Sequence, residues 1–455
     1  MGDFISINPA TGRELSRRPA LDAAAVDAAL DRAEQALPRW QEAGFHGRAE
    51  VLEAAARLLE ADAKRLAALM SSEMGKPFAQ GVAEAEKCAW ACRFYAEHAE
   101  RFLADDPHES DGSRAFVRYE PVGMLLAVMP WNFPFWQVFR MVAPALMAGN
   151  VVLVKHAASV PQCAEAIATL LRRAGAPRGV YEDLAIDHDA VERVIADPRV
   201  GALSLTGSDG AGRAVAATAG KHLKRCILEL GGSDPAIVMP SADLDKAIPT
   251  ILKGRTQNNG QSCIATKRVI VHAAIAEAFE RRFIAAMGAL KVGDPMDESV
   301  DIGPLATESI RDGLAKQVRD TVERGATCVL GGKPLPGPGF FYAPTVLKDI
   351  PDGSPAADDE LFGPVASLFV VDDLDAAIAV ANGTRFGLGA AAWTRDDDEI
   401  TAFIDRLRAG NVFVNGLVKS DPRLPFGGIK DSGYGRELGR AGIRGLCVTK
   451  TVWVD

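Results

Sequence analysis

The sequence contains no apolar run long enough to cross a membrane. A spanning helix needs about 20 consecutive apolar residues, and the densest apolar stretch, Val122–Pro130, is about half that length and is typical of a buried strand. The first residues, Met1–Ser6, lack the basic and apolar segments of a secretory signal peptide. We therefore expect no membrane partner and a cytoplasmic location.

Basic residues are fewer than acidic residues in this sequence. Lys and Arg together number 51 against 60 Asp and Glu, so the formal net charge is -9. Nucleic-acid binders obtain most of their affinity from cationic contacts to phosphates. The charge balance therefore argues against a nucleic-acid partner.

Cysteine is scarce and scattered. The 7 cysteines are an odd number, and none of them has metal-ligand spacing. A disulfide framework and a metal site are therefore not expected, and a reducing compartment suits such a chain.

Several catalytic signatures are missing from the sequence. It has no HExxH, GxSxG, protein-kinase, P-loop or GxGxxG pattern. Zincins, serine hydrolases, kinases and proteins with the standard dinucleotide fingerprint are not indicated.

What the sequence does contain is the composition and periodicity of a multidomain α/β protein. Its 455 residues are 48% hydrophobic and 24% charged, and they exceed the roughly 250–300 residues of a single core. After an Ala-rich helical region at 21–103, short apolar runs such as Val151–Lys155 and Val200–Thr206 alternate with amphipathic stretches. This alternation predicts parallel sheets covered by helices, in two α/β units, the second beginning near Leu230.

Two segments offer candidate catalytic groups. Cys263 follows Gly260-Gln-Ser in a turn, where a thiol and its own backbone N–H can both face a substrate. Most isolated cysteines are structural, so this feature alone is compatible with a structural cysteine and with a catalytic one. Glu229 lies between two leucines and runs into Gly231-Gly232; a carboxylate there is either a half-exposed strand end or a base.

Two further segments offer polar groups for binding. The turn Pro130-Trp-Asn-Phe-Pro134 has a proline at each end and can hold the Asn132 amide in a fixed direction, as an oxyanion donor or as a structural corner. The glycine-rich segment Leu205–Arg213 joins a strand to a helix, whose N-terminus suits a phosphate group.

Taken in order, these segments resemble the aldehyde dehydrogenase superfamily. The resemblance runs nearly end to end, and its details look most like the bacterial succinate-semialdehyde dehydrogenases. It is carried by Ile7–Gly12, Pro130–Pro134, Thr206–Ser208, Glu229–Gly232, Gly260–Cys263, Glu360–Pro364 and Pro425–Gly433.

The resemblance implies two Rossmann-type parallel-sheet domains and a small β oligomerisation arm, in a homodimer or homotetramer. The expected cofactor-binding domain covers 1–229, with 113–119 in the arm. The catalytic domain covers 230–418, and 419–455 returns to the first domain and ends in an oligomerisation strand.

The resemblance also implies a mechanism. Cys263 attacks the aldehyde carbon, and Asn132 with the Cys263 backbone N–H stabilises the oxyanion. Hydride then passes to a nicotinamide cofactor, NAD or NADP, and Glu229 activates the water that hydrolyses the thioester. The residues implied in cofactor binding are Trp131, Lys155, Gly207, Ser208, Glu360 and Phe362. Ala158 stands where strictly NAD-dependent members often carry Glu, so a 2′-phosphate is not repelled there.

Succinate semialdehyde is the expected substrate by the same resemblance. Arg140 matches an arginine associated with that substrate, although a structural ion pair is an equal alternative. A second arginine of the family is replaced by Gln257, and Ser420, Lys419 or Arg423 can compensate. The alternatives are oxidation of another aliphatic or aromatic aldehyde, a coenzyme-A-acylating enzyme, and a catalytically silent binding or structural protein of the same fold.

Overall fold

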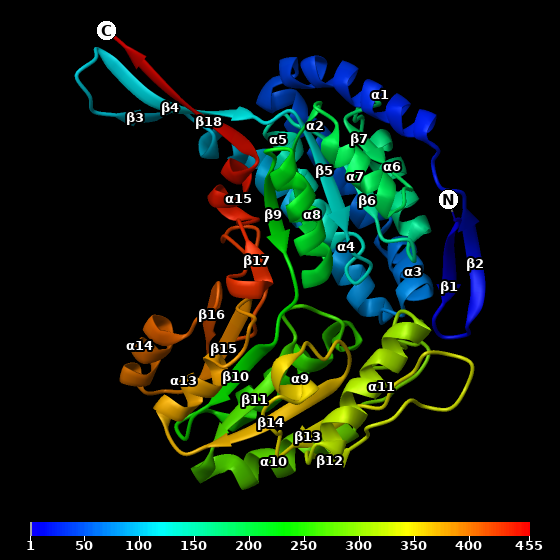
Figure 1. Cartoon of the computed structure of the whole chain (residues 1–455), viewed down its shortest axis with the longest axis vertical. Helices are drawn as coiled ribbons and strands as arrows, with labels where there is room; N and C mark the ends of the chain where they lie inside the picture. Colours follow the sequence, from blue (N-terminus) through cyan, green and yellow to red (C-terminus); the bar gives the residue numbers. More distant parts are fainter. Residues whose placement is uncertain (1) are drawn as a thin grey trace.

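The computed structural model describes residues 2–455, so only the first residue of the expected cofactor-binding domain lies outside it. Two lobes are each built on a mainly parallel sheet, and an antiparallel arm projects from one of them (Figure 1). The predicted α/β class, with two parallel-sheet units and a small β arm, is confirmed.

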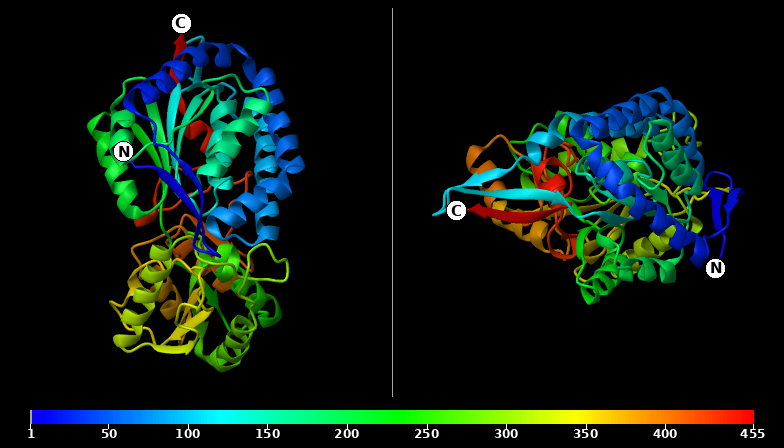
Figure 2. Two further views of the ribbon diagram at one scale, coloured as in Figure 1. Left: turned by 90° about the vertical axis from the view of Figure 1, so that its right-hand side faces the viewer. Right: turned by 90° about the horizontal axis from the view of Figure 1, so that it is seen from above.

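The first lobe contains a six-stranded sheet in the order β17-β9-β8-β5-β6-β7, parallel except for the pairing of β17 with β9. Its central strands are apolar and buried on both faces, as expected where helices cover both sides (Figure 2). The strands are β5 (Met124–Met129), β6 (Val151–His156), β7 (Tyr181–Asp183), β8 (Val200–Thr206), β9 (Arg225–Glu229) and β17 (Gly433–Tyr434).

Nine helices precede, connect or follow these strands. They are α1 (Ala23–Glu42), α2 (Gly44–Ala61), α3 (Ala63–Met74), α4 (Phe78–Phe102), α5 (Trp136–Met147), α6 (Pro161–Arg173), α7 (His188–Ala196), α8 (Asp209–Lys221) and α15 (Gly439–Gly445). The first four form the Ala-rich helical region that the sequence predicts.

The second lobe contains a seven-stranded sheet in the order β12-β13-β14-β11-β10-β15-β16, with only β12 antiparallel to its neighbour. The strands are β10 (Asp234–Val238), β11 (Thr266–His272), β12 (Thr327–Leu330), β13 (Thr345–Lys348), β14 (Val365–Val371), β15 (Gly389–Trp393) and β16 (Asn411–Val414). The helices are α9 (Leu244–Thr256), α10 (Ala273–Gly288), α11 (Glu308–Glu323), α12 (Pro355–Asp358), α13 (Leu374–Asn382) and α14 (Asp397–Arg406).

Two small antiparallel sheets complete the fold. The arm consists of β18 (Cys447–Val454), β4 (Arg114–Pro121) and β3 (Asp106–His108), with β18 on its open edge. The hairpin of β1 (Phe4–Asn8) and β2 (Arg13–Arg18) reaches the other lobe, where the Phe340 N–H donates to the Pro9 carbonyl (Figure 2).

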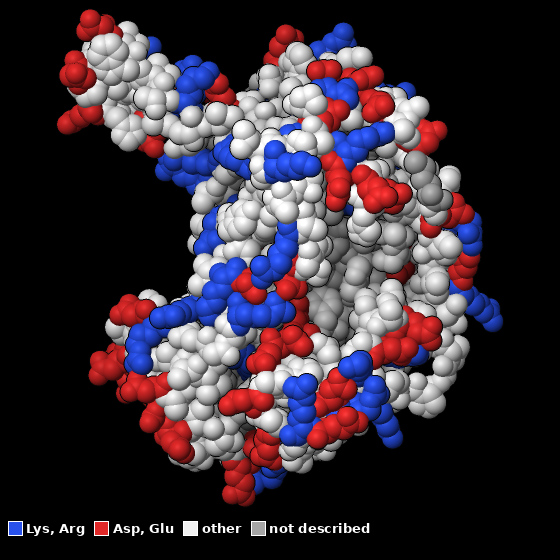
Figure 3. All heavy atoms as spheres, viewed as in Figure 1, with Lys and Arg blue, Asp and Glu red and all other residues white. Residues whose placement is uncertain are grey.

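The chain enters the second sheet after β9 and returns to the first sheet at β17. The division of the chain into domains near residue 230 stays a prediction. On the face seen in Figure 3, acidic and basic side chains are interspersed. Within residues 2–455, no helix is both long and apolar enough to cross a bilayer.

Candidate active site

A cleft of about 300 Å³ opens where the two lobes meet. Its walls come from the ends of β5 and β8 in the first lobe and from the loops before β11 and β14 in the second. Seven of the predicted residues line it together: Trp131, Asn132, Gly207, Ser208, Cys263, Glu360 and Phe362. Lys155, Glu229, Arg140, Gln257 and Ser420 lie outside this lining.

The loop that carries Cys263 is fixed by two asparagines in a 3-10 turn, Gln257–Gly260. Asn258 and Asn259 have φ of 56° and 59°, a left-handed conformation that asparagine tolerates better than most residues. Asn259 Nδ2 donates to the carbonyls of Gly75 and Pro304, at 2.7 and 2.9 Å. The loop that carries Cys263, the predicted nucleophile, is therefore anchored to the first lobe as well as to its own.

The Asn132 turn is joined to the same loop. Asn132 Nδ2 donates to the Gln261 carbonyl at 3.1 Å, and Asn258 Nδ2 donates to the Asn132 carbonyl at 2.7 Å. His156 Nε2 lies 2.8 Å from the Pro134 carbonyl, and burial lowers the pKa of His156 to about 4, so the ring stays neutral. The amide of Asn132 is thus held beside the backbone of the nucleophile loop.

A buried lysine, Lys267, hydrogen-bonds to the backbone at Cys263. Lys267 Nζ donates to the carbonyls of Ser262 and Cys263, both at 2.6 Å, and to Glu360 Oε1 at 2.8 Å. Burial raises the pKa of the Cys263 thiol to about 12, and the charges of Lys267 and Arg140 oppose that rise. Lys267 therefore connects the nucleophile loop to a carboxylate on the cleft wall.

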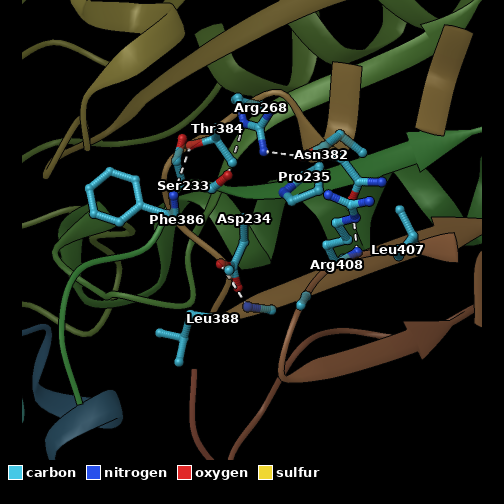
Figure 4. A pocket seen from close by; sticks show the side chains of 15 residues that line it. Ser233, Asp234, Pro235, Arg268, Asn382, Thr384, Phe386, Leu388, Leu407 and Arg408 are labelled. Atoms are coloured by element: carbon cyan, nitrogen blue, oxygen red, sulfur yellow. Dashed lines mark hydrogen bonds between the residues drawn. The ribbon is translucent and has the colours of Figure 1, made fainter. Parts of the chain in front are cut away.

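Asp234 lies at the start of β10 beneath the same loop. One of its oxygens accepts the Gly389 N–H at 3.0 Å (Figure 4), and the other has no partner within residues 2–455. Burial raises the pKa of Asp234 to about 7. A Cβ on Gly232 would lie 2.5 Å from the Cys263 carbonyl, so only glycine permits this close packing.

Glu229 ends β9 as a buried carboxyl group, and neither oxygen has a hydrogen-bond partner in the described chain. Burial raises its pKa well above the usual range; the charge of Arg140 opposes this and that of Glu437 adds to it. The side chain approaches Gly427, where a Cβ would meet Glu229 Oε1 at 2.8 Å. Glu229 therefore faces a polar cluster behind the cleft.

Of the expected cofactor ligands, Lys155 lies outside the lining of the cleft and the others lie in it. Lys155 is the second-last residue of β6; it is half-buried, has no side-chain hydrogen-bond partner in residues 2–455, and burial lowers its pKa. Ser208 Oγ caps α8 by accepting the Ala211 N–H at 3.2 Å. Across the cleft, the rings of Trp131 from the first lobe and Phe362 from the second meet edge to face at 5.7 Å between centroids.

The three residues expected to bind the substrate differ in their hydrogen-bond and ion-pair partners. Arg140 is 2% exposed and forms a buried ion pair with Glu437, the structural arrangement we gave as its alternative. Gln257 is half-buried and makes no side-chain hydrogen bond within residues 2–455. Ser420 is buried and accepts hydrogen bonds from Lys87 Nζ and Trp136 Nε1.

Sequence reasoning missed Lys87, Lys267 and Glu437. Lys267 left one signal, because it stands with Arg268 directly before the apolar run Val269-Ile-Val271 of β11, where burial of a charge is costly without partners. Lys87 is one polar residue among many on a long amphipathic helix. Glu437 belongs to a short irregular segment whose partners lie far away in the sequence.

The profile of the aldehyde dehydrogenase family matches residues 2–452. The chain belongs to the aldehyde dehydrogenase family. It is 54% identical over 453 residues to a Mycolicibacterium paratuberculosis protein named succinate-semialdehyde dehydrogenase (NADP+), covering 99% of this chain and 96% of that one. A Mycobacterium tuberculosis protein of similar name is 53% identical over 452 residues, 99% of either chain.

Solved structures of the family have the same fold. The succinic semialdehyde dehydrogenase of Streptococcus pyogenes, in complex with NADP+, superposes with a TM-score of 0.97 at 34% identity, over 99% of both chains. The succinate-semialdehyde dehydrogenase of Burkholderia pseudomallei gives 0.96 at 35% identity, over 100% of this chain and 94% of that one. The predicted resemblance is thus confirmed over the whole described chain.

Proposed function

We propose that this aldehyde dehydrogenase oxidises succinate semialdehyde to succinate, with NADP or NAD as hydride acceptor. The observation that carries the proposal is one cleft in which Cys263, the Asn132 turn and Glu360 meet. The names of the mycobacterial relatives support the substrate and NADP.

In the first step, Cys263 Sγ attacks the carbonyl carbon while its proton passes to water in the open cleft. The thiol pKa of about 12 means that little thiolate exists before substrate binds, so the proton leaves as the S–C bond forms. The new oxyanion is stabilised by the Cys263 N–H and by Asn132 Nδ2, which exchanges its bond to the Gln261 carbonyl for one to the oxyanion.

The cleft fits a nicotinamide dinucleotide. Lys155 has free donors for ribose hydroxyls, the start of α8 at Ser208 suits a pyrophosphate, and Glu360 can accept from the second ribose. Ala158 leaves room for a 2′-phosphate without a repelling charge. When bound, the cofactor would accept the hydride. The protein would position the substrate carbon in the cleft for that transfer.

In the last step, Glu229 takes a proton from the water that hydrolyses the Cys263 thioester. Its carboxyl faces Gly427 and Arg140, so the side chain has to turn toward Cys263 for this step. Its raised pKa makes the ionised carboxylate a stronger base than an ordinary glutamate. We further propose that the arm of β3, β4 and β18 joins subunits of a homodimer or homotetramer, because β18 offers an unpaired edge.

The test is the formation of reduced nicotinamide with succinate semialdehyde, butanal and benzaldehyde, using either cofactor, for wild type and Glu229→Gln. We expect steady turnover by the wild type and one stoichiometric burst, then a stalled thioester, in the variant. No reduction with any aldehyde would favour a silent member of the fold. Product formation only with coenzyme A would favour an acylating enzyme.

A further inference from the structure

A half-buried lysine lies beside Trp136, which begins α5 four residues after Asn132. Lys87 Nζ, on α4, donates to Ser420 Oγ at 2.9 Å and lies 4.1 Å from the centre of the Trp136 ring. Trp136 Nε1 donates to the same oxygen at 3.0 Å. Three segments distant in the sequence therefore converge on one hydroxyl group.

The charge of Lys87 has no counterion among the described residues. The nearby carboxylates are already engaged: Glu84 pairs with Lys76 and accepts two backbone N–H groups, and Asp421 accepts Arg423 at 2.8 and 2.6 Å. Arg140 is likewise paired with Glu437. A mostly buried cation without a partner is costly, and such groups cluster where a charged ligand binds.

The cluster also has spare hydrogen-bond donors. An ammonium group has three N–H donors, and Lys87 uses one of them. Both acceptor positions of the Ser420 oxygen are occupied by Lys87 and Trp136, which leaves its own O–H free to donate. An oxygen anion is the ligand that such a set of donors requires.

The cluster lies close to the reacting thiol. Trp136 begins α5 four residues after Asn132, and Arg140 follows one turn later on the same helix. The N–H groups of Phe135 and Trp136 both donate to Glu84 Oε1 at 2.9 Å, so α4, which carries Lys87, packs against the segment between Asn132 and α5. A ligand anchored at Lys87 can therefore extend toward Cys263.

We propose that Lys87 and Ser420 bind the carboxylate of an ω-carboxylated aldehyde while Cys263 attacks its carbonyl. This inference rests on the proposed function and identifies the cation that selects the substrate. Lys87 then supplies the positive charge for the carboxylate, because Gln257 is uncharged and the charge of Arg140 is paired with Glu437.

The site has a built-in pH dependence. Burial, helped by the charge of Arg140, lowers the pKa of Lys87 to about 8, against the opposing charges of Cys88, Glu84 and Asp421. Above that pH, Lys87 loses the charge that attracts the carboxylate. The KM for succinate semialdehyde should then rise steeply, by up to about tenfold for each pH unit, while the KM for butanal does not follow.

The mutational test uses Lys87→Met, with Lys87→Arg as the charge-conserving control. Succinate semialdehyde and butanal have the same number of carbons and differ in the carboxylate. In Lys87→Met we expect kcat/KM for succinate semialdehyde to fall about 10- to 150-fold, mainly through KM, and kcat/KM for butanal to stay within about threefold. Lys87→Arg should retain most of the preference.

The outcomes separate this inference from the proposed function. Equal losses on both aldehydes, or an unchanged KM for succinate semialdehyde, would overturn the role of Lys87. If Lys87→Met does not fold, parallel pH profiles of the two KM values in the wild type would overturn it equally. A wild type that reduces neither cofactor with either aldehyde would reject the proposed function itself.

Discussion

Replacing Glu229 by Gln should make the protein more stable, and increasingly so as the pH rises. The side chain is 2% exposed and its oxygens have no partners within residues 2–455, so ionisation in the native state is costly. Gln keeps the shape of the protonated acid and cannot ionise.

The sign and size follow from proton linkage. Burial raises the native pKa of Glu229 well above its value of about 4.3 in an unfolded chain. Above pH 4.3 the unfolded state releases a proton that the native state retains. The wild type therefore loses about 1.4 kcal/mol of unfolding free energy for each pH unit until the native pKa is reached, and the variant does not.

The measurement is urea unfolding of both proteins between pH 4.5 and 8, taking the difference in unfolding free energy at each pH so that all shared groups cancel. Glu86→Gln on the exposed face of α4 is the matched control and should give a flat difference. A difference between wild type and Glu229→Gln that stays constant over this range would refute the reasoning.

Three further changes test the site and the arm. Asn132→Ala should lower kcat about 10²- to 10³-fold, and an unchanged kcat would remove its oxyanion role. Lys267→Met removes the charge that most lowers the pKa of Cys263, so alkylation of Cys263 by iodoacetamide at pH 8 to 9 should slow. An equal or faster rate would count against this electrostatic role of Lys267. Deletion of 448–455 should give monomers in sedimentation, and oligomers that persist would place the interface elsewhere.

The sequence by itself determined the class of fold and most of the cleft. Alternation of apolar runs with amphipathic stretches depends only on neighbouring residues, and it predicted strands such as β6 and β8 within a residue of their observed ends. Periodicity alone does not set the start of β13, which begins at Thr345 although apolar residues occur from Phe340 onward, because Pro344 ends the preceding loop. The segments that carry Asn132 and Cys263 are short and continuous, so a resemblance could point to them.

Only the tertiary structure decided which charges are paired. Arg140 meets Glu437, Lys267 meets Glu360, and Lys87 meets Ser420, all across long separations in the sequence. Whether a buried cation is neutralised or left to bind a ligand depends on which carboxylates the folded chain brings beside it. For Arg140 and Lys87 that outcome is set by the packing of α4 and α5 against the segments after β16, because electrostatic interactions inside a protein depend on distance and burial and not on order along the chain.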